Sequence, residues 1–150
     1  MKRRQMCGFT LLEVLLVLAV LGTVISMARL VPLGSPHRLA QQDAQMFLQL
    51  FEQSRDRALL EGQLLGMHID AGGFQVMRYT ERGWYLTGRR VASDLELQLE
   101  LDSVSELPGN APQLQLSGDQ EHAPFVLAFG RAGETLACVV SDGLDARIGC

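Results

Sequence analysis

Three patterns in the sequence predict an α+β protein, in which a long N-terminal α-helix packs on one or more antiparallel β-sheets. The first is an apolar run over residues 9–31, whose charged side chains are Glu13 and Arg29. The second is a helical repeat of small and apolar residues after Leu39, and the third is an alternation of leucine with polar residues over 94–102. A period near 3.6 indicates helix and a period of two indicates strand, so helix is expected first and sheet afterwards.

Residues 9–31 predict a transmembrane helix. At about 1.5 Å per residue the run covers roughly 34 Å, enough to cross a hydrocarbon core of about 30 Å. A basic triplet, Lys2 to Arg4, precedes the run and few basic residues follow it. The N-terminus is therefore predicted to be cytoplasmic, with the chain after about residue 32 on the far side. The alternative is a plain uncleaved anchor, but that leaves Glu13 unexplained, because a carboxylate is costly in lipid.

The charge and the cysteines of the chain indicate the properties of the part that follows the span. Without the basic triplet, the 13 basic residues fall to 10 against 17 acids, a formal charge of −7, which lacks the basic footprint of a nucleic-acid-binding protein. Cys7 is predicted on the cytoplasmic side, whereas Cys138 and Cys150 would lie in an oxidising compartment. We therefore predict a Cys138–Cys150 disulfide that ties the C-terminus to a preceding strand.

A break at residues 32–36, which contains proline and glycine, separates the span from a second helical pattern. Small and apolar residues then follow a 4-3-4-3-4 spacing, with polar residues on the opposite side. The repeat consists of Ala40, Ala44, Phe47, Phe51, Ser54 and Ala58. Gly62 is the expected C-cap, so residues 32–62 are predicted as an amphipathic extension of the N-terminal helix.

Residues 63–150 predict a β-rich globular part with about seven strands, because the period shifts to two. Turn sequences at 70–73, 81–83 and 130–133 join neighbouring strands into hairpins. The stretch DLELQLELD places leucines on one face and mostly acids on the other, which indicates a strand with one wet face. The strands are expected over 64–69, 74–79, from 84 onwards, 95–101, 114–116, 124–129 and 135–140.

No residue cluster in the sequence predicts an enzyme, and no cofactor or metal is predicted. His37, His68 and His122 lie far apart and outside any metal-ligand or nucleophile spacing. His68 is expected as a satisfied strand residue. Trp84 is expected to pack on the sheet, with a ligand platform as the alternative.

Two further groups of charged residues have a simple interpretation and an alternative. Arg55 and Arg57 are most simply a solvated or ion-paired face of the helix, and the alternative is docking of a partner. Asp142, Gly143 and Asp145 predict a solvated turn, and the alternative is a calcium site built from oxygen ligands.

The start of the chain resembles the signal of type IV pilins and type II secretion pseudopilins. The features that carry the resemblance are a short basic leader, the sequence GFTLLE from Gly8 to Glu13, and the apolar span. The resemblance implies that residues 1–8 form a leader, removed by a prepilin peptidase between Gly8 and Phe9, and that the new amine of Phe9 is methylated. It also implies that Glu13 pairs with the N-terminal amine of a neighbouring subunit and so promotes ordered assembly.

A second set of segments resembles the H-type minor pseudopilins, the GspH/FimT family. These segments are FEQSRDRALLEGQLLGMHID, GGFQVMRY, GWY and PFVLAFGRAGE, which together with the signal span nearly the whole chain. Residues 95–123 carry the resemblance least. The resemblance implies a pilin-like fold, in which one half of the N-terminal helix is transmembrane and the other half packs on the sheet.

The function implied by this resemblance is that of a minor pseudopilin near the tip of the periplasmic pseudopilus, needed to export folded proteins across the outer membrane. It implies a single-pass protein of the Gram-negative inner membrane with a periplasmic globular domain. The implied partners are pseudopilins of the I, J and K types, the major pseudopilin, the prepilin peptidase/methyltransferase, inner-membrane lipid and secreted substrates.

The sequence has two alternative functional interpretations. A minor type IV pilin of the FimT/FimU kind would act in pilus initiation or DNA uptake. Residues 91–150 contain only Arg131 and Arg147 as basic residues against ten acids, which argues against a DNA contact. A membrane-anchored periplasmic enzyme lacks any supporting cluster of residues.

Overall fold

The computed structural model describes residues 11–28, 34–102, 111–119 and 121–150, with side chains of the first range described for 11–20. The chain divides into two compact units, Met1–Ser35 and Pro36–Cys150. Among the described residues, the first unit contains helix α1, and the second contains helix α2 and eight strands.

Helix α1 (Leu11–Ala28) is built almost entirely from apolar residues, with Glu13 in its first turn. Its bounds fall inside the predicted span of 9–31, whose ends lie outside the described residues. Among the described residues, no helix has both the length and the hydropathy needed to cross a membrane. The predicted single span therefore stays a prediction.

Helix α2 (Pro36–Glu61) is the predicted amphipathic helix. Its buried residues match the predicted repeat without exception: Ala40, Ala44, Phe47, Phe51, Ser54 and Ala58. The helix begins three residues before Leu39, at Pro36, because proline fits the first turn, where its missing N–H has no intrahelical acceptor. Gly62 follows with a φ of 61°, the left-handed conformation expected of a C-cap glycine.

The first sheet has the strand order β3-β2-β1-β5 and is antiparallel throughout. Its strands are β1 (Leu65–Asp70), β2 (Gly73–Thr80), β3 (Gly83–Ala92) and β5 (Leu114–Leu116). Gly66 of β1 allows a close approach of Pro112, since a Cβ built at Gly66 would lie 2.2 Å from the Pro112 Cγ atom. Beyond the short β5, Gln113 replaces a strand partner, because its side chain bonds both the N–H and the carbonyl of Ile69.

The second sheet has the order β4-β6-β7-β8 and is also antiparallel. Its strands are β4 (Glu96–Leu101), β6 (Phe125–Arg131), β7 (Glu134–Ser141) and β8 (Ala146–Ile148). In β4 the acids are exposed and the leucines partly buried, which confirms the predicted strand with one wet face.

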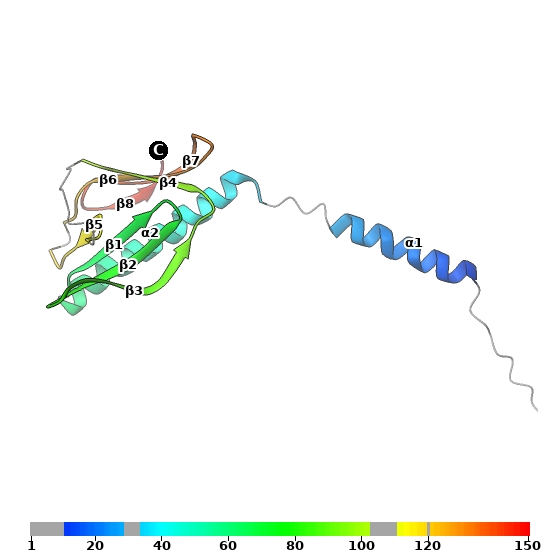
Figure 1. Cartoon of the computed structure of the whole chain (residues 1–150). Helices are drawn as coiled ribbons and strands as arrows, with labels where there is room; N and C mark the ends of the chain where they lie inside the picture. The colour runs from blue at the N-terminus through cyan, green and yellow to red at the C-terminus, as the bar shows by residue number, and fades with distance from the viewer. Residues whose placement is uncertain (1–10, 29–33, 103–110, 120) are drawn as a thin grey trace, which may run out of the picture. The chain divides into compact units, whose positions relative to one another are not determined.

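One face of α2 packs against both sheets, which lie along the helix in Figure 1. The ring of Phe47 meets that of Phe74 in β2 at 5.2 Å and that of Phe125 in β6 at 6.1 Å, both nearly edge to face. Phe51 contacts Phe125 at 5.3 Å. Aromatic rings in this arrangement add to the free energy gained from burial alone, so α2 is the element that joins the two sheets into one core.

The observed fold is the predicted α+β fold, and in the described part of the chain its strands form two separate four-stranded sheets. One strand of these sheets, β8, was not predicted. β8 is only three residues long and its residues do not alternate cleanly, so it carries no period that sequence could reveal. It is a strand through its antiparallel pairing with β7, where Val139, Val140 and Ser141 face Ile148, Arg147 and Ala146.

Candidate functional site

The described part of α1 is a surface of apolar side chains around a single acid. Eight large apolar side chains between Leu11 and Val20 are exposed, and Leu11 is 80% exposed. Glu13 is exposed among them, in the first turn, where a negative charge interacts favourably with the helix dipole. A contiguous apolar surface of this size marks a site of contact with other helices or with lipid.

The predicted processing site precedes this helix. Gly8 and Phe9, like Cys7, lie outside the described residues. Cleavage between Gly8 and Phe9, methylation of Phe9 and the role of Glu13 therefore stay predictions.

A bidentate ion pair links β1 to β3 in the globular unit. The Arg90 guanidinium donates to both carboxylate oxygens of Asp70, at 2.6 and 2.7 Å, and the Gly72 N–H donates to Asp70 Oδ1 at 2.8 Å. The hydrogen bond from Arg90, and after it the bond from Gly72, lowers the pKa of Asp70 from 3.8 to about 2. His68 lies in β1 as predicted, with Nε2 3.9 Å from Asp70 Oδ2. This cluster therefore ties the end of β1 to β3 across the intervening strand β2.

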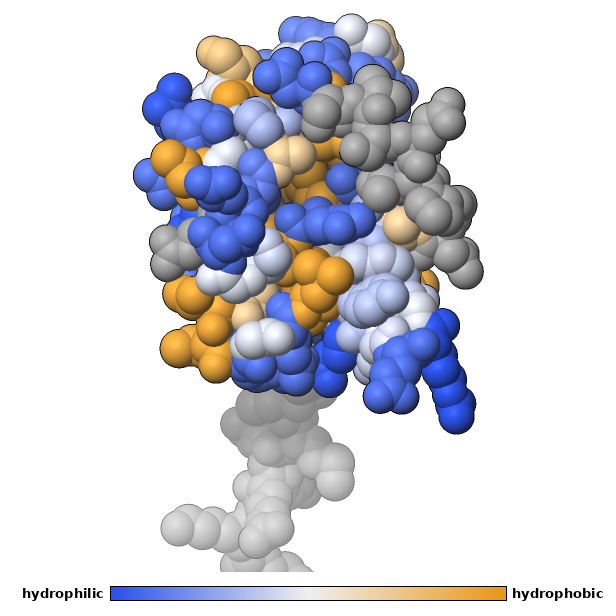
Figure 2. Space-filling view, turned by 90° about the vertical axis from the view of Figure 1, so that its left-hand side faces the viewer, coloured by the Kyte–Doolittle hydropathy of each residue, from blue (hydrophilic) through white to orange (hydrophobic). Residues whose placement is uncertain are grey.

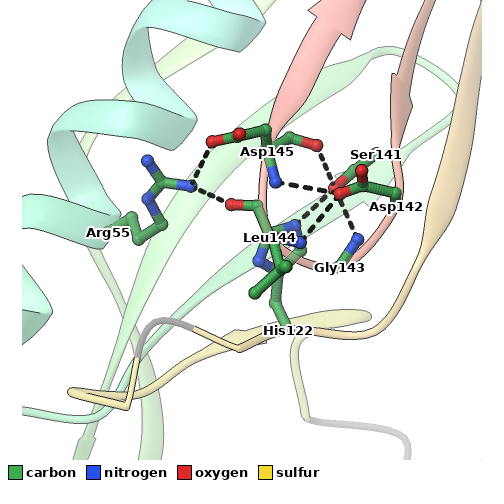
Figure 3. A network of polar contacts seen from close by, with 7 residues as sticks. All are labelled: Arg55, His122, Ser141, Asp142, Gly143, Leu144 and Asp145. Atoms are coloured by element: carbon green, nitrogen blue, oxygen red, sulfur yellow. Dashed lines mark hydrogen bonds and ion pairs between the residues drawn. The ribbon is translucent and has the colours of Figure 1, made fainter.

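A second polar network joins α2 to the turn between β7 and β8 (Figure 3). Arg55 donates to the carbonyl oxygen of Leu144 at 2.5 Å, and its Nη1 atom lies 3.9 Å from the carboxylate of Asp145. Arg57, two residues on, donates to Glu61 at 2.8 Å. The interpretation of both arginines as ion-paired is confirmed, and Arg55 also holds the C-terminal turn against the helix.

Ser141 lies at the centre of the same network (Figure 3). Its hydroxyl donates to the Asp145 carbonyl at 2.8 Å, and its oxygen accepts the Gly143 N–H at 3.2 Å. Nε2 of His122 lies 2.6 Å from the same Ser141 oxygen, within hydrogen-bond distance. The His122 ring also packs edge-on against Phe51 at 4.9 Å. These contacts give His122 a structural position.

The segment from Asp142 to Asp145 is a turn. Asp142 Oδ1 accepts the N–H groups of Leu144 and Asp145, both at 3.0 Å, and these bonds lower the pKa of Asp142, with Asp145 the larger cause. Among the described residues, no three His, Cys, Asp or Glu side chains converge to hold a metal ion. Asp142 is engaged by backbone donors and Asp145 faces Arg55, so the arrangement fits a hydrogen-bonded turn better than the calcium alternative.

A disulfide joins Cys138 of β7 to Cys150, as predicted, across a sequence separation of 12 residues and a Cα–Cα distance of 5.5 Å. The N–H of Gly149 also donates to the carbonyl of Cys138 at 3.0 Å. The C-terminus is thus fixed to β7 by one covalent bond and by the short ladder of β8.

The outer surface of the globular unit exposes further apolar side chains. Figure 2 shows hydrophobic groups between hydrophilic ones at the end of the unit where α2 finishes. Leu60, in the last turn of α2, is 84% exposed. On the outer face of the first sheet, Tyr79 packs against Trp84 with ring centroids 5.3 Å apart, which confirms the sheet-packing role predicted for Trp84.

Comparison with known proteins agrees with this architecture. Residues 3–28 match the prokaryotic N-terminal methylation motif. The fold is similar to the minor pseudopilin EpsH from the type 2 secretion system of Vibrio cholerae, with a TM-score of 0.62 and 24% identity over 73% of this chain and 94% of that one. It is also similar to the solution structure of GspH from Escherichia coli, with a TM-score of 0.62 and 22% identity over 80% of this chain and 94% of that one.

These observations define the class of protein as one with a pilin-like fold and an N-terminal methylation motif. The sequence is 31% identical to type II secretion system protein H of Escherichia coli K12 over 94% of each chain, and 30% identical to protein H of Aeromonas hydrophila over 86% of this chain and 76% of the relative. The chain belongs to the family of type II secretion system protein H, whose members are structural pseudopilins.

Sequence reasoning missed the residues that the fold brings together from distant segments. Arg55 and Asp145 are 90 positions apart, and Asp70 and Arg90 lie on non-adjacent strands. The Arg57–Glu61 pair differs, because its i,i+4 spacing on a helix is itself a signal for an ion pair.

Proposed function

We propose that this minor pseudopilin is a structural and non-catalytic subunit near the tip of the periplasmic pseudopilus, and that export of folded proteins across the outer membrane requires it. The observation that carries the proposal is the similarity to protein H of Escherichia coli over 94% of both chains. Glu13 within an exposed apolar helix supports the same role.

The proposal includes processing at the N-terminus. A prepilin peptidase removes residues 1–8 by cleavage between Gly8 and Phe9, and the new amine of Phe9 is methylated. The match to the N-terminal methylation motif over residues 3–28 supports this step. Residues 9–31 then form a single span of the inner membrane, with the N-terminus cytoplasmic and residues 63–150 periplasmic, because the basic triplet precedes the span.

Processing also explains the acid in the span. Cleavage creates a free α-amine four positions before Glu13, with an ordinary pKa near 8. A carboxylate left alone in lipid costs roughly 2.5 kcal/mol or more, so a neighbouring subunit that supplies this amine removes a penalty borne by the lone subunit. Glu13 therefore favours assembly with the major pseudopilin and with the I, J and K types.

The experiment that tests the function is deletion of the gene, with complementation by the full chain. We expect deletion to abolish release of secreted hydrolases and to leave pilus-driven motility intact. Complementation should restore secretion. Loss of motility with intact secretion would contradict the proposal and would favour the minor type IV pilin.

A further inference from the structure

A cavity of about 200 Å³ lies between α2 and the first sheet. One part of its wall is apolar and another carries two cations. The residues that matter here are Leu50, Leu65 and Val76 on the apolar side, with Arg57, Arg78 and Thr87 on the polar side. The cavity is separate from the Asp70 cluster and from the network around Arg55, since none of its lining residues belongs to either.

Arg78 occupies an unusual place in this cavity. It is paired in register with Leu65, which is only 2% exposed, so its side chain projects from the face of the sheet that packs on α2. Its Nε atom is buried, and among the described residues no acceptor lies within hydrogen-bond reach. A guanidinium stays charged at physiological pH, and a buried donor without an acceptor raises the free energy of the folded state. An incoming anion would relieve this cost.

Arg57, on the opposite wall of the cavity, also favours binding of an anion. It lies on α2, where it donates to Glu61, and its side chain remains largely exposed beside the cavity. The segment of β2, β3 and their turn is also basic, because it contains Arg78, Arg82 and Arg89 against one acid, Glu81, in addition to Arg90, which Asp70 pairs. An acidic partner is therefore favoured over a neutral or basic one.

The size of the cavity limits the kind of acid it can hold. Pockets for small molecules usually measure about 300–1,000 Å³, so this cavity suits one side chain better than a metabolite. The neighbouring strand β3 is an edge strand in the described sheet, and it extends over ten residues from Gly83 to Ala92. An unpaired edge of this length can accept an extended segment from another protein, with side chains directed into adjoining pockets.

We propose that this cavity receives an aspartate or glutamate side chain from an extended segment of a neighbouring pseudopilin, with Arg78 and Arg57 as the carboxylate receptors. The proposal rests on the pseudopilus role given above and names a contact within it. Arg78 Nε donates to the carboxylate, and the aliphatic part of the incoming side chain packs on Leu50, Leu65 and Val76.

The test uses the full-length chain in cells that assemble the secretion machine. A photo-crosslinking amino acid replaces Gln53, an exposed residue on the rim of the cavity, and the crosslinked peptides are mapped by mass spectrometry. We expect crosslinks to another pseudopilin at a segment that contains Asp or Glu. Arg78→Glu should lower their yield by about tenfold or more, because like charges then face each other.

Arg82→Glu is the matched control, since it makes the same charge change on the neighbouring β2–β3 turn, outside the cavity lining. It should change the yield less than twofold. Arg57→Glu lies on an exposed helix position and decides the outcome if Arg78→Glu fails to fold; it should also lower the yield severalfold. Replacing the mapped partner carboxylate by arginine should restore crosslinking to Arg78→Glu or, where that variant does not fold, to Arg57→Glu.

Absence of a pseudopilin crosslink from Gln53, or a yield that both charge reversals leave unchanged, would overturn the proposal. Gene deletion separates this failure from failure of the proposed function. If deletion abolishes secretion while Arg78 and Arg57 have no effect on crosslinking, only the contact is wrong. If deletion leaves secretion intact, the pseudopilus role itself is wrong.

Discussion

Three charged residues, Glu13, Arg78 and Asp70, differ in whether an oppositely charged group of the same chain pairs with them. Glu13 is an acid in the first turn of an apolar helix, and Arg78 is a cation on the core-facing side of a sheet. Asp70 is the contrasting case, because Arg90 and Gly72 satisfy its carboxylate within the same chain. A charged group that is paired within the chain stabilises the fold. A charged group that lies among apolar groups without such a pair favours binding of an oppositely charged group from another subunit.

The first prediction concerns Glu13. Glu13→Leu should insert into the membrane at least as well as the wild type, because the cost of a carboxylate in lipid, roughly 2.5 kcal/mol, is removed. Crosslinking to other pseudopilins and secretion of hydrolases should both fall, because the partner of the neighbouring amine is lost. Glu13→Asp, which keeps the charge, is the control and should retain more of both activities. Wild-type assembly by Glu13→Leu would contradict the role of this acid.

The second prediction concerns Asp70 and pH. The pKa of Asp70 in the folded protein is about 2, below its ordinary 3.8, so its stabilising contribution is present above about pH 4 and is lost as the pH falls toward 2. The two side chains are 39% and 41% exposed, and solvent screening therefore limits the pair to about 1 kcal/mol or less. Asp70→Asn should lower the free energy of unfolding by that amount at pH 7, with a difference that disappears near pH 2.

Urea denaturation at several pH values measures this difference. Arg90→Gln supplies the second arm of a double-mutant cycle, in which the double variant should lose little more than either single one. Fully additive losses would show that the two side chains do not act as a pair.

At the scale of secondary-structure elements, the stability of the C-terminal segment depends on its contacts with β7 and α2. β8 has three residues and pairs only with β7 in the described sheet, so its own ladder is weak. The disulfide to Cys150 and the contact of Arg55 with Leu144 hold the two ends of this segment. Short elements of this kind are stable only when such tertiary contacts fix them.

The third prediction concerns the disulfide. Replacing both Cys138 and Cys150 by serine should lower the free energy of unfolding by about 2–3 kcal/mol, because the unfolded chain is no longer restricted by the closed loop. Denaturation of the purified protein measures the loss, and hydrogen exchange should show faster opening of β8 than of β6. The oxidised and reduced wild type provide the control. Equal stability of the two forms would contradict a stabilising role.

At the scale of the whole molecule, α2 connects two sheets that do not form one continuous ladder. Phe47 contacts Phe74 in one sheet and both Phe125 and Phe129 in the other. Because the same side chain belongs to both interfaces, its loss should loosen the globular unit as a whole rather than one layer.

The fourth prediction tests this shared core. Phe47→Ala should lower the free energy of unfolding by about 3–5 kcal/mol, the usual cost of removing a buried aromatic ring. Met46→Ala, at the adjacent but exposed helix position, is the control and should cost about 0.5 kcal/mol or less. Thermal denaturation measures both. A small loss for Phe47→Ala would mean that the sheets hold together without the helix.

The local parts of this fold could be predicted from the sequence because their signals are periodic. The buried positions of α2 recur every three or four residues, and the leucines of β4 recur every two. Gly62 marked the end of α2, and Cys138 and Cys150 were the two cysteines expected in an oxidising compartment. Each of these features follows from a few neighbouring residues or from residue type alone.

The remaining features depend on contacts between segments far apart in the chain. The same strand pattern is compatible with one sheet or with two, since alternation shows which side chains share a face but not which strands are neighbours. β8 has too few residues to show a period. The position of Arg78 on the buried face of the sheet could not be predicted either. A charged residue in a strand is normally expected on the exposed face, and the sequence alternation does not show that this face packs on α2.

The sequence by itself determined the order of helix and strands, the face that α2 buries and the resemblance to pseudopilins, because these depend on local spacing and residue type. Only the tertiary structure decided the division into two sheets, the fastening of the C-terminal turn by Arg55 and the cavity that contains Arg78. The physical reason is that packing selects among strand arrangements by long-range burial and hydrogen bonding, which no local pattern encodes.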